Sequence, residues 1–350
     1  MVNGQQTGNG ITVLCTLRFS EAQLDKLRAV SPRLEVVQHT VRRGQAPPAG
    51  LVAAAEIVYL LSPWLDPARA PRLKWVQLHS AGINHLLDSP LWRSEVPLTT
   101  ANGIHAIAIG EYVLAMALAL TRKVPKMLHY QRAREWPPGR WDKFVSTELH
   151  GATMGIVGYG GIGRAVARLA AAFGMRVLAL NRDGRRSSTV DVRWSIPGAG
   201  DPEASLPERI FSPDGLPDLL AQSDIVVLAA PLIPATRHLI DEAALRRMKP
   251  NALLINVARG GLVDEAALVR ALEEDWIAGA ALDVFEEEPL PAGSPLWRLA
   301  EATDRLLISP HVSSFTPAYD DRVTDLFAEN LRRYLAGRPL LNRVRRERGY

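Results

Sequence analysis

Short, continuously apolar runs alternate with helical patterns along most of this 350-residue chain, and this alternation limits the fold more than any other feature. A strand that is apolar at every position is buried on both faces, as strands of a parallel sheet are. Helical segments separate many of the runs, so the chain is expected to form an α/β fold with parallel sheets. The candidate strands lie at 11–17, 34–39, 56–61, 73–79, 154–158, 175–180, 225–230, 252–257, 279–284 and 306–309.

The length favours two domains, because single hydrophobic cores stop growing at roughly 250–300 residues. The segment 104–121 is apolar almost all round, which predicts a helix buried between the domains. The last helical pattern has an apolar stripe from Val323 to Tyr334 and ends at Gly337. If this helix packs back on the first third of the chain, one domain is discontinuous. The stretch 184–207 is rich in Gly, Pro and Ser, which predicts a surface loop between two strands.

Composition narrows the class of protein. The net charge of +4 is too small to indicate a nucleic-acid partner, and the basic residues near the C-terminus are interpreted as a solvated tail: Arg343, Arg345, Arg346 and Arg348. The lone Cys15 argues against a disulfide framework and a CxxC metal or redox site, so no metal is expected. Because Cys15 stands inside an apolar run, we expect a buried strand thiol.

Targeting signals are not evident. The first ten residues lack the basic and apolar regions of a signal peptide. The longest nearly apolar stretch is interrupted by Glu111 and is too short to span a bilayer comfortably. A cytoplasmic protein without a membrane partner is therefore expected.

A glycine-rich turn, Gly158-Tyr159-Gly160-Gly161-Ile162-Gly163, follows one candidate strand and precedes a helix. In such a turn Gly158 permits the tight bend, Gly160 lets the backbone approach a pyrophosphate, and Gly163 lets the helix lie close to the strand. The N-terminus of the helix offers N–H groups to the phosphates. The motif predicts a dinucleotide site, although a glycine turn that serves only packing has the same pattern.

The next strand ends in Leu180-Asn181-Arg182, about 20 residues past the glycines, where an acidic residue would bind the adenosine ribose hydroxyl. Asn181 does not repel a 2′-phosphate, and Arg182 can donate to it. Arg185 and Arg186 add positive charge nearby. These residues favour NADP over NAD as the cofactor. Asp183 is the alternative, since a shifted strand end would let it bind the hydroxyl.

Three segments place Arg259, Glu288 and His311 just past the carboxyl ends of strands, where open α/β sheets bind ligands. Reduction of a 2-oxo acid needs a bidentate donor for the carboxylate, which Arg supplies. It also needs a proton donor that titrates near neutrality, for which His is suited. A carboxylate bonded to that His fixes its tautomer and favours its protonated form. Taken singly, His311 could be structural, Arg259 could cap a loop, and the acidic run 286–288 could be a solvated face.

The order and spacing of these motifs resemble the D-isomer-specific 2-hydroxyacid dehydrogenase family, in its glyoxylate or hydroxypyruvate reductase branch, over nearly the whole chain. The segments that carry the resemblance are the glycine-rich turn, INVARGGLVDEAAL, GAALDVFEEEPL and SPH. The resemblance implies two doubly wound parallel-sheet domains. A Rossmann dinucleotide-binding domain (104–314) would be inserted into a flavodoxin-like substrate domain (1–103 and 315–350). It also implies a homodimer built largely through the coenzyme domains.

Within this resemblance, further residues acquire expected roles. The backbone N–H groups of Ala81 and Gly82 would help hold the substrate carboxylate, although this loop could be an ordinary tight turn. Asn102 would lie near the hinge, and Asp283 would accept a hydrogen bond from the nicotinamide carboxamide. The expected cofactor contacts are Gly158, Gly160, Gly161, Ile162, Gly163, Asn181, Arg182, Pro231, Ala258 and Asp283. The sequence departs from the family pattern at Asn84, Ile233 and Ser313, and none of these changes removes a catalytic role.

The expected activity is hydride transfer between NAD(P)H and a small 2-oxo acid, giving a D-2-hydroxy acid. A non-catalytic dinucleotide-sensing protein of the same superfamily is the alternative, although the sequence has no partner-binding extension. The segment 134–141 carries two Trp on a Pro-rich connection, which suits a subunit interface, and packing within one subunit is the alternative.

Overall fold

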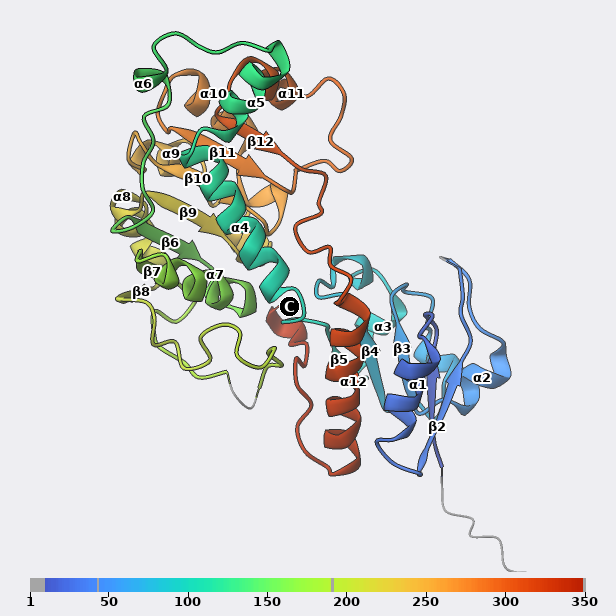
Figure 1. The fold of residues 1–350 in the computed structure, drawn as a ribbon. Coiled ribbons are helices and arrows are strands. Elements are labelled where there is room, and N and C mark those ends of the chain that lie inside the picture. The colour runs from blue at the N-terminus through green and yellow to red at the C-terminus, as the bar shows by residue number, and fades with distance from the viewer. Residues whose placement is uncertain (1–9, 43, 190–191, 349–350) are drawn as a thin grey trace, which may run out of the picture. The chain divides into compact units, whose positions relative to one another are not determined.

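The structure, a computed structural model, describes residues 10–42, 44–189 and 192–348, with the side chains of Asn84 and Arg348 excepted. The described residues form two compact units (Figure 1). The first unit takes in the described parts of 1–104, 190–194 and 317–350, and the second takes in those of 105–189 and 195–316. The sequence did not indicate that the short segment around Trp194 clusters with the first unit.

The first unit is built on a five-stranded sheet with the strand order β2-β1-β3-β4-β5, in which all pairings are parallel. Its strands are β1 (Ile11–Cys15), β2 (Leu34–Gln38), β3 (Ile57–Leu60), β4 (Trp75–Leu78) and β5 (Leu98–Thr99).

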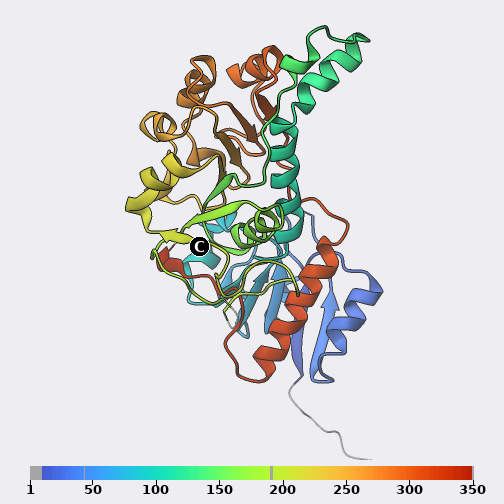
Figure 2. The ribbon, with the colours of Figure 1, turned by 60° about the vertical axis from the view of Figure 1, so that its left-hand side comes forward.

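Both faces of this sheet are covered by helices. On one face, Val13 and Cys15 pack in a cluster with Phe327 of α12. On the other face, Leu14 packs in a cluster with Val52 of α2. Figure 2 shows α12 lying across the strands of this unit. The helical elements of the unit are α1 (Glu21–Arg28), α2 (Ala49–Ala54), η1 (Pro67–Arg69), η2 (Asn84–Leu86), α3 (Pro90–Arg93), α12 (Tyr319–Leu335) and η6 (Arg346–Arg348).

The second unit is built on a seven-stranded parallel sheet with the order β12-β11-β10-β9-β6-β7-β8. Its strands are β6 (Thr153–Val157), β7 (Arg176–Leu180), β8 (Arg209–Phe211), β9 (Ile225–Leu228), β10 (Leu253–Asn256), β11 (Gly279–Leu282) and β12 (Leu306–Ile308). The chain runs from β6 outward to β8 and then crosses to β9 on the other side of β6. Ligands bind outside the carboxyl ends of strands at such a switch point, and the glycine-rich turn follows β6 there.

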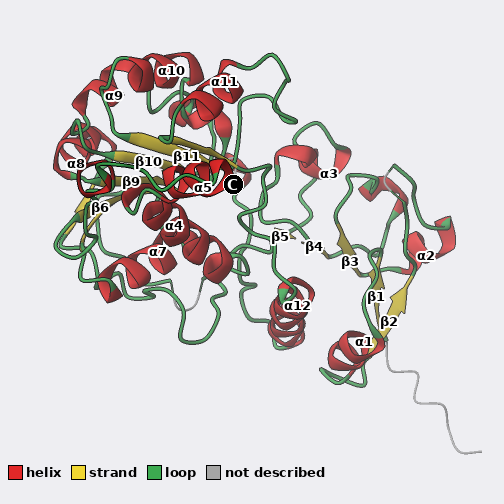
Figure 3. Ribbon diagram, turned by 45° about the horizontal axis from the view of Figure 1, so that its top comes forward, coloured by secondary structure: helices red, strands yellow, loops and turns green. Residues whose placement is uncertain are grey.

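Helices lie on both sides of the second sheet (Figure 3). Helices α4 and α7 cover one face, and α8 to α11 cover the other. The helical elements are α4 (Ala106–Thr121), α5 (Val124–Ala133), α6 (Arg140–Lys143), α7 (Gly161–Ala172), η3 (Pro213–Gly215), α8 (Leu216–Gln222), η4 (Pro234–Thr236), α9 (Glu242–Arg247), η5 (Gly260–Leu262), α10 (Glu265–Glu273) and α11 (Pro295–Ala302). Of the helices among the described residues, none combines the length and the apolar character needed to cross a bilayer.

These sheets confirm the expected fold class of two parallel-sheet α/β domains, and each of the ten candidate strands is present. The expected buried thiol is also confirmed, because Cys15 in β1 is fully buried. The two short edge strands β5 and β8 were not predicted.

Three expectations need correction. Helix α4 is not buried all round, because its buried residues form one face while Glu111 and Ala115 are exposed. The loop between β7 and β8 is not wholly on the surface, because Asp201 and Ala204 are buried. The basic C-terminal segment is not simply a solvated tail, since the Arg346 guanidinium donates to the carbonyls of Trp92 and Val96 in the same unit.

Candidate active site

His311 and Glu288 form a bonded pair in the second unit. Nδ1 of His311 lies 2.8 Å from Oε2 of Glu288, and both side chains remain accessible, with 47% and 36% of their surface exposed. The other carboxylate oxygen, Oε1, accepts the backbone N–H of Phe285 at 3.1 Å, which fixes the glutamate on its own loop. Because Nδ1 is bonded to the carboxylate, Nε2 is the ring nitrogen available for exchanging a proton with a bound molecule.

The loop that carries His311 is folded around Asp283, a fully buried residue at the end of β11. The Asp283 carboxylate accepts the backbone N–H groups of Val312 at 2.8 Å and Ser313 at 3.0 Å, and its own carbonyl accepts the N–H of His311 at 2.9 Å. His311 itself has a left-handed backbone (φ 55°), which is uncommon for a residue with a side chain. Converging N–H groups of this kind make an anion-binding concavity, and here Asp283 occupies it.

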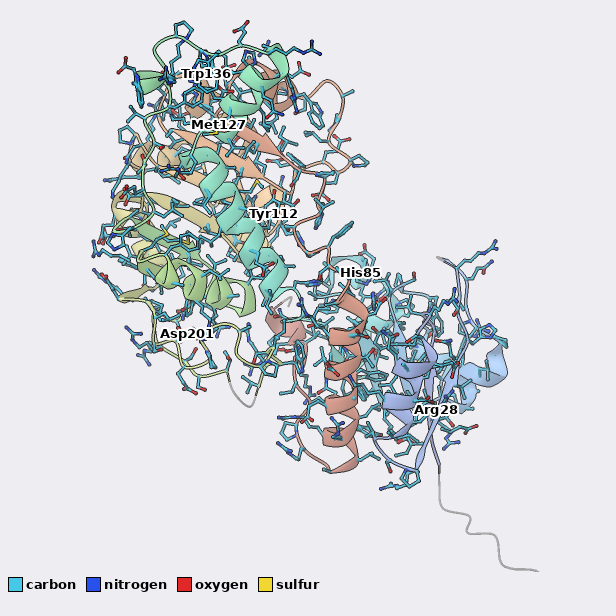
Figure 4. All side chains as sticks on the ribbon, viewed as in Figure 1. Arg28, His85, Tyr112, Met127, Trp136 and Asp201 are labelled. Carbon is cyan, nitrogen blue, oxygen red and sulfur yellow. The ribbon has the colours of Figure 1, made fainter. Side chains whose placement is uncertain are left out.

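A third donor to Asp283 links the loop to helix α4. The hydroxyl of Ser309 donates to Asp283 at 2.5 Å and lies 2.6 Å from the hydroxyl of Tyr112. Since the single hydroxyl hydrogen of Ser309 is donated to Asp283, Tyr112 is the donor to Ser309. Burial raises the pKa of Tyr112, and this effect exceeds the opposing effect of the bond to Ser309, so the phenol stays protonated at neutral pH. Sequence reasoning missed Tyr112, which lies on α4 (Figure 4) and far from these motifs in the sequence.

Arg259 follows β10 in a turn that Asn256 shapes. The Asn256 side chain donates to the carbonyl of Arg259 at 2.9 Å and accepts the N–H of Ala258 at 3.1 Å. The guanidinium donates to the Ala258 carbonyl at 2.5 Å. Burial lowers the pKa of Arg259, and the Glu288 carboxylate opposes that shift, so the electrostatic influence of Glu288 reaches the guanidinium. An arginine remains charged at neutral pH in any case.

Gly260 holds the Arg259 turn against the Glu288 loop. A Cβ at Gly260 would lie 1.8 Å from the carbonyl carbon of Phe285 and 2.0 Å from its oxygen. Only glycine permits this approach of two backbones. The turn after β10 and the loop after β11 are therefore in direct contact, which brings Arg259, Glu288 and His311 together at the carboxyl ends of three adjacent strands.

The glycine-rich turn has the geometry of a cradle. Gly158 has a left-handed backbone (φ 105°), and a Cβ there would lie 2.5 Å from the backbone nitrogen of Ala230. A Cβ at Gly163 would lie 2.2 Å from the carbonyl oxygen of Gly158, so α7 begins as close to β6 as a glycine permits. Gly160 is the N-cap residue of α7, and Gly161 and Ile162 form its first turn. The backbone N–H groups at this helix start fit the phosphates of a dinucleotide.

The end of β7 carries the residues expected at the adenosine ribose. The Asn181 side chain donates to the carbonyl of Arg185 at 2.8 Å and accepts the N–H of Asp183 at 3.1 Å. The guanidinium of Arg182 is paired with the Asp183 carboxylate, with Nε 2.9 Å from Oδ1. The end of β7 therefore carries the amide of Asn181 and the ion pair of Arg182 with Asp183.

The other expected residues are described within their own units. Pro231 follows β9 in the second unit, and its carbonyl accepts the Thr236 hydroxyl at 2.8 Å. In the first unit, the loop after β4 is closed by the Ser80 hydroxyl, which donates to the carbonyl of Gly82 at 2.8 Å, while Ala81 is partly buried. The Asn102 carbonyl accepts the Asn342 side chain at 2.7 Å.

The group of Arg259, Glu288 and His311 combines a fixed cation, a carboxylate and an imidazole at one edge of a parallel sheet. Such a set can bind a carboxylate through the guanidinium and exchange a proton with an adjacent oxygen through the imidazole. The same sheet presents a helix N-terminus for phosphates at its switch point.

Comparison with known proteins places the chain in a family. The profile for the D-isomer specific 2-hydroxyacid dehydrogenase NAD binding domain matches residues 114–313. The glyoxylate reductase of Thermofilum pendens is 37% identical over 270 residues, which are 77% of this chain and 74% of that protein. An (S)-sulfolactate dehydrogenase of Chromohalobacter salexigens is 37% identical over 275 residues, which are 77% of this chain and 80% of that protein.

A solved structure agrees with these sequence matches. The crystal structure of a D-isomer specific 2-hydroxyacid dehydrogenase from Xanthobacter autotrophicus Py2, in complex with NADPH and MES, superposes with a TM-score of 0.75. It has 30% identity and covers 98% of this chain and 100% of that one. The protein therefore belongs to the D-isomer specific 2-hydroxyacid dehydrogenase family of oxidoreductases, which bind NAD(P) and act on CH–OH groups.

Proposed function

We propose that the protein reduces a small 2-oxo acid to the corresponding D-2-hydroxy acid, with Arg259, Glu288 and His311 as its catalytic residues. The observation that carries this proposal is the 2.8 Å contact between Glu288 and His311 at the strand edge that also bears Arg259. A bound nicotinamide dinucleotide supplies the hydride. The relatives named glyoxylate reductase support a small 2-oxo acid as substrate.

The chemistry assigns one role to each residue. Arg259 binds the substrate carboxylate and draws electron density from the adjacent carbonyl. His311 gives its Nε2 proton to the carbonyl oxygen as negative charge develops there. Glu288 keeps the imidazole in the orientation and tautomer that leave Nε2 facing the substrate. The pair is accessible to a small molecule because neither side chain is buried.

Substrate contacts outside this group belong to the first unit. We propose that the N–H groups of Ala81 and Gly82 hold the substrate carboxylate and that Asn102 marks the hinge. On the cofactor side, Asp283 would accept from the nicotinamide carboxamide. Its Oδ2 already accepts the N–H of Ser313 and the residue is fully buried, so this contact requires the loop at Ser313 to shift.

The test is a screen of glyoxylate, hydroxypyruvate, pyruvate and aryl-pyruvates with NADPH and NADH, followed by variants. His311→Ala and Arg259→Ala should each lower kcat/KM by about 100-fold or more while dinucleotide binding persists. His238→Ala is the matched control, since His238 and Glu286 form another pair of 2.8 Å that is not part of the proposed site. Near-wild-type activity of the His311 variant, or an equal loss in the control, contradicts the assignment. Tight dinucleotide binding with no turnover of any 2-oxo acid would indicate a non-catalytic protein.

We further propose that NADPH is preferred over NADH. The side chain at position 181 is an amide instead of a carboxylate, and Arg182 beside it can donate to a 2′-phosphate. In the structure Arg182 is paired with Asp183, so binding of a 2′-phosphate requires the guanidinium to leave that exposed carboxylate. The Xanthobacter relative was crystallised with NADPH.

We also propose a homodimer in which the segment after α5 contacts the partner. Trp136 and Trp141 are 83% and 77% exposed, and Arg140 lies between them, 4.5 Å from the ring centroid of Trp141. Met127 and Leu128 of α5 are also exposed, and exposed apolar side chains of this density are typical of interfaces. Figure 4 shows Met127 and Trp136 at one end of this unit.

Light scattering should give a dimer for the wild type and a monomer for Trp136→Ala/Trp141→Ala, with Trp297→Ala as a control. A monomeric wild type at micromolar concentration refutes the dimer.

A further inference from the structure

The loop between β7 and β8 is anchored by one buried acidic residue. Asp201 is 4% exposed, and Figure 4 shows it on the loop next to α7. Its Oδ1 accepts the backbone N–H of Ser205 at 2.9 Å and the Ser205 hydroxyl at 3.0 Å. Its Oδ2 accepts the N–H of Leu206 at 3.0 Å. The carboxylate thus organises its own segment of loop and still has capacity for a further donor.

The further donor comes from inside the glycine-rich turn. The hydroxyl of Tyr159, which stands between Gly158 and Gly160, donates to Oδ2 of Asp201 at 2.6 Å. Burial alone would raise the pKa of Asp201, but the bonds from Tyr159, Leu206 and Ser205 hold it below its ordinary range. Burial raises the pKa of Tyr159, and the neighbouring Asp201 raises it further. The contact is therefore a charge-assisted bond between a neutral phenol and an ionised carboxylate.

Arg164 fastens the same loop to the first turn of α7. Its guanidinium is buried and donates to the carbonyls of Asp201 at 2.5 Å, Pro202 at 3.2 Å and Ser187 at 2.8 Å. Its Cζ lies 5.0 Å from the ring centroid of Tyr159. Tyr159 in the glycine-rich turn and Arg164 just after it therefore both form hydrogen bonds to this loop.

We propose that Asp201 is a positioning residue for the dinucleotide, acting through Tyr159. Glycine loses more conformational freedom on ordering than any other residue, and the turn contains four glycines within six positions. The side chain of Tyr159, 5% exposed, is its principal attachment to the loop. The bond to Asp201 holds the turn in the one conformation that presents the N-terminus of α7 to a pyrophosphate. Binding then requires less ordering, which raises affinity. The inference rests on the proposed function, since it assumes that this turn binds the cofactor.

The experiment compares Tyr159→Phe and Asp201→Asn with the wild type. Phenylalanine keeps the ring and removes only the hydroxyl, whereas asparagine places an NH₂ group where Tyr159 and Leu206 donate. We expect Tyr159→Phe to raise the Kd of the reduced dinucleotide, measured by fluorescence titration, by about tenfold. The KM for the dinucleotide should rise in parallel, while kcat at saturation stays within about twofold, because the bound geometry is unchanged. Asp201→Asn should raise Kd further.

Glu208→Gln is the matched control. It breaks the 2.8 Å ion pair between Arg176 and Glu208. This pair lies at the amino ends of β7 and β8, so the variant should leave Kd unchanged. The inference is overturned by an unchanged Kd in Tyr159→Phe. It is also overturned by fewer binding sites per chain at an unchanged Kd, which would signal a purely structural role. If Asp201→Asn does not fold, the Kd of Tyr159→Phe alone tests the inference. A wild type that binds no dinucleotide contradicts the proposed function itself, whereas a wild type that turns over normally beside unaffected variants contradicts only this inference.

Discussion

Replacing side chains at the end of β7 should change the preference between NADPH and NADH. The size of the change depends on the contacts of Arg182. Arg182 is paired with Asp183, and the two side chains are 49% and 62% exposed. An exposed ion pair contributes about 0–1 kcal/mol. A charge-assisted bond to a 2′-phosphate contributes roughly 1.5–3 kcal/mol. Moving the guanidinium from the carboxylate to the phosphate therefore gains roughly 0.5–3 kcal/mol, a factor of about 2 to 150 in favour of NADPH.

Two variants should shift this preference in opposite directions. Asn181→Asp with Arg182→Ala removes the donor and adds a carboxylate that repels the phosphate. The ratio of kcat/KM for NADPH to that for NADH should then fall by about 10- to 100-fold. Asp183→Asn removes the partner of Arg182 without touching the guanidinium, so the same ratio should rise, by at most about fivefold.

The assay is steady-state kinetics with each reduced dinucleotide at a fixed 2-oxo acid concentration. Arg209→Ala is the control for loss of one positive charge, because Arg209 stands at the opposite end of the neighbouring strand β8. A wild type that prefers NADH by about tenfold contradicts the assignment of Arg182. So does an Asp183→Asn variant that loses NADH activity alone, since Asp183 would then be the acceptor for the ribose hydroxyl.

Two further predictions follow from burial and close packing. Gly260→Ala should lower kcat/KM by about 100-fold or more, because the added Cβ forces the Arg259 turn away from Phe285. Gly293→Ala is the control and should be neutral, because a Cβ there meets no described atom within 4 Å. Equal activities of the two variants would contradict the reasoning. Burial raises the pKa of Cys15 from 9.0 to about 12. In that interval the thiol ionises in the unfolded chain and stays protonated in the folded one, so the wild type should lose up to about 1.4 kcal/mol of unfolding free energy per pH unit relative to Cys15→Ala. Urea titrations of both proteins at several pH values measure this difference, and parallel curves would refute it.

The strands could be predicted from the sequence because parallel sheets are buried on both faces. A run such as 225–230 is apolar at each position, and no helix begins inside it. The edge strands β5 and β8 were missed because two or three residues carry no periodic signal, and Thr99 and Arg209 are not apolar. The length of a strand therefore sets the limit of this reasoning.

The candidate catalytic residues could be named because each stands immediately past a predicted strand. Parallel strands bring their carboxyl ends to one edge, so residues far apart in the sequence were expected to meet there. Their supports could not be named in the same way. Tyr112 acts through Ser309 from a helix almost 200 positions earlier, and nothing in the pattern of α4 marks that tyrosine. Asp201 lies in a stretch whose composition indicates only a loop, and the phenol that donates to it belongs to Tyr159, 42 positions away.

The residues that hold Arg259, Glu288 and His311 in place explain why the spacing of the motifs predicts the site. Asn256 shapes the turn of Arg259, the N–H of Phe285 holds Glu288, and Asp283 gathers the loop of His311. Each support lies at or just past the end of β10 or β11, and Gly260 and Asp283 join the three loops to one another. An insertion in any of these loops would therefore move a side chain of the proposed catalytic group. The three proposed catalytic residues and the residues that support them all belong to the second unit.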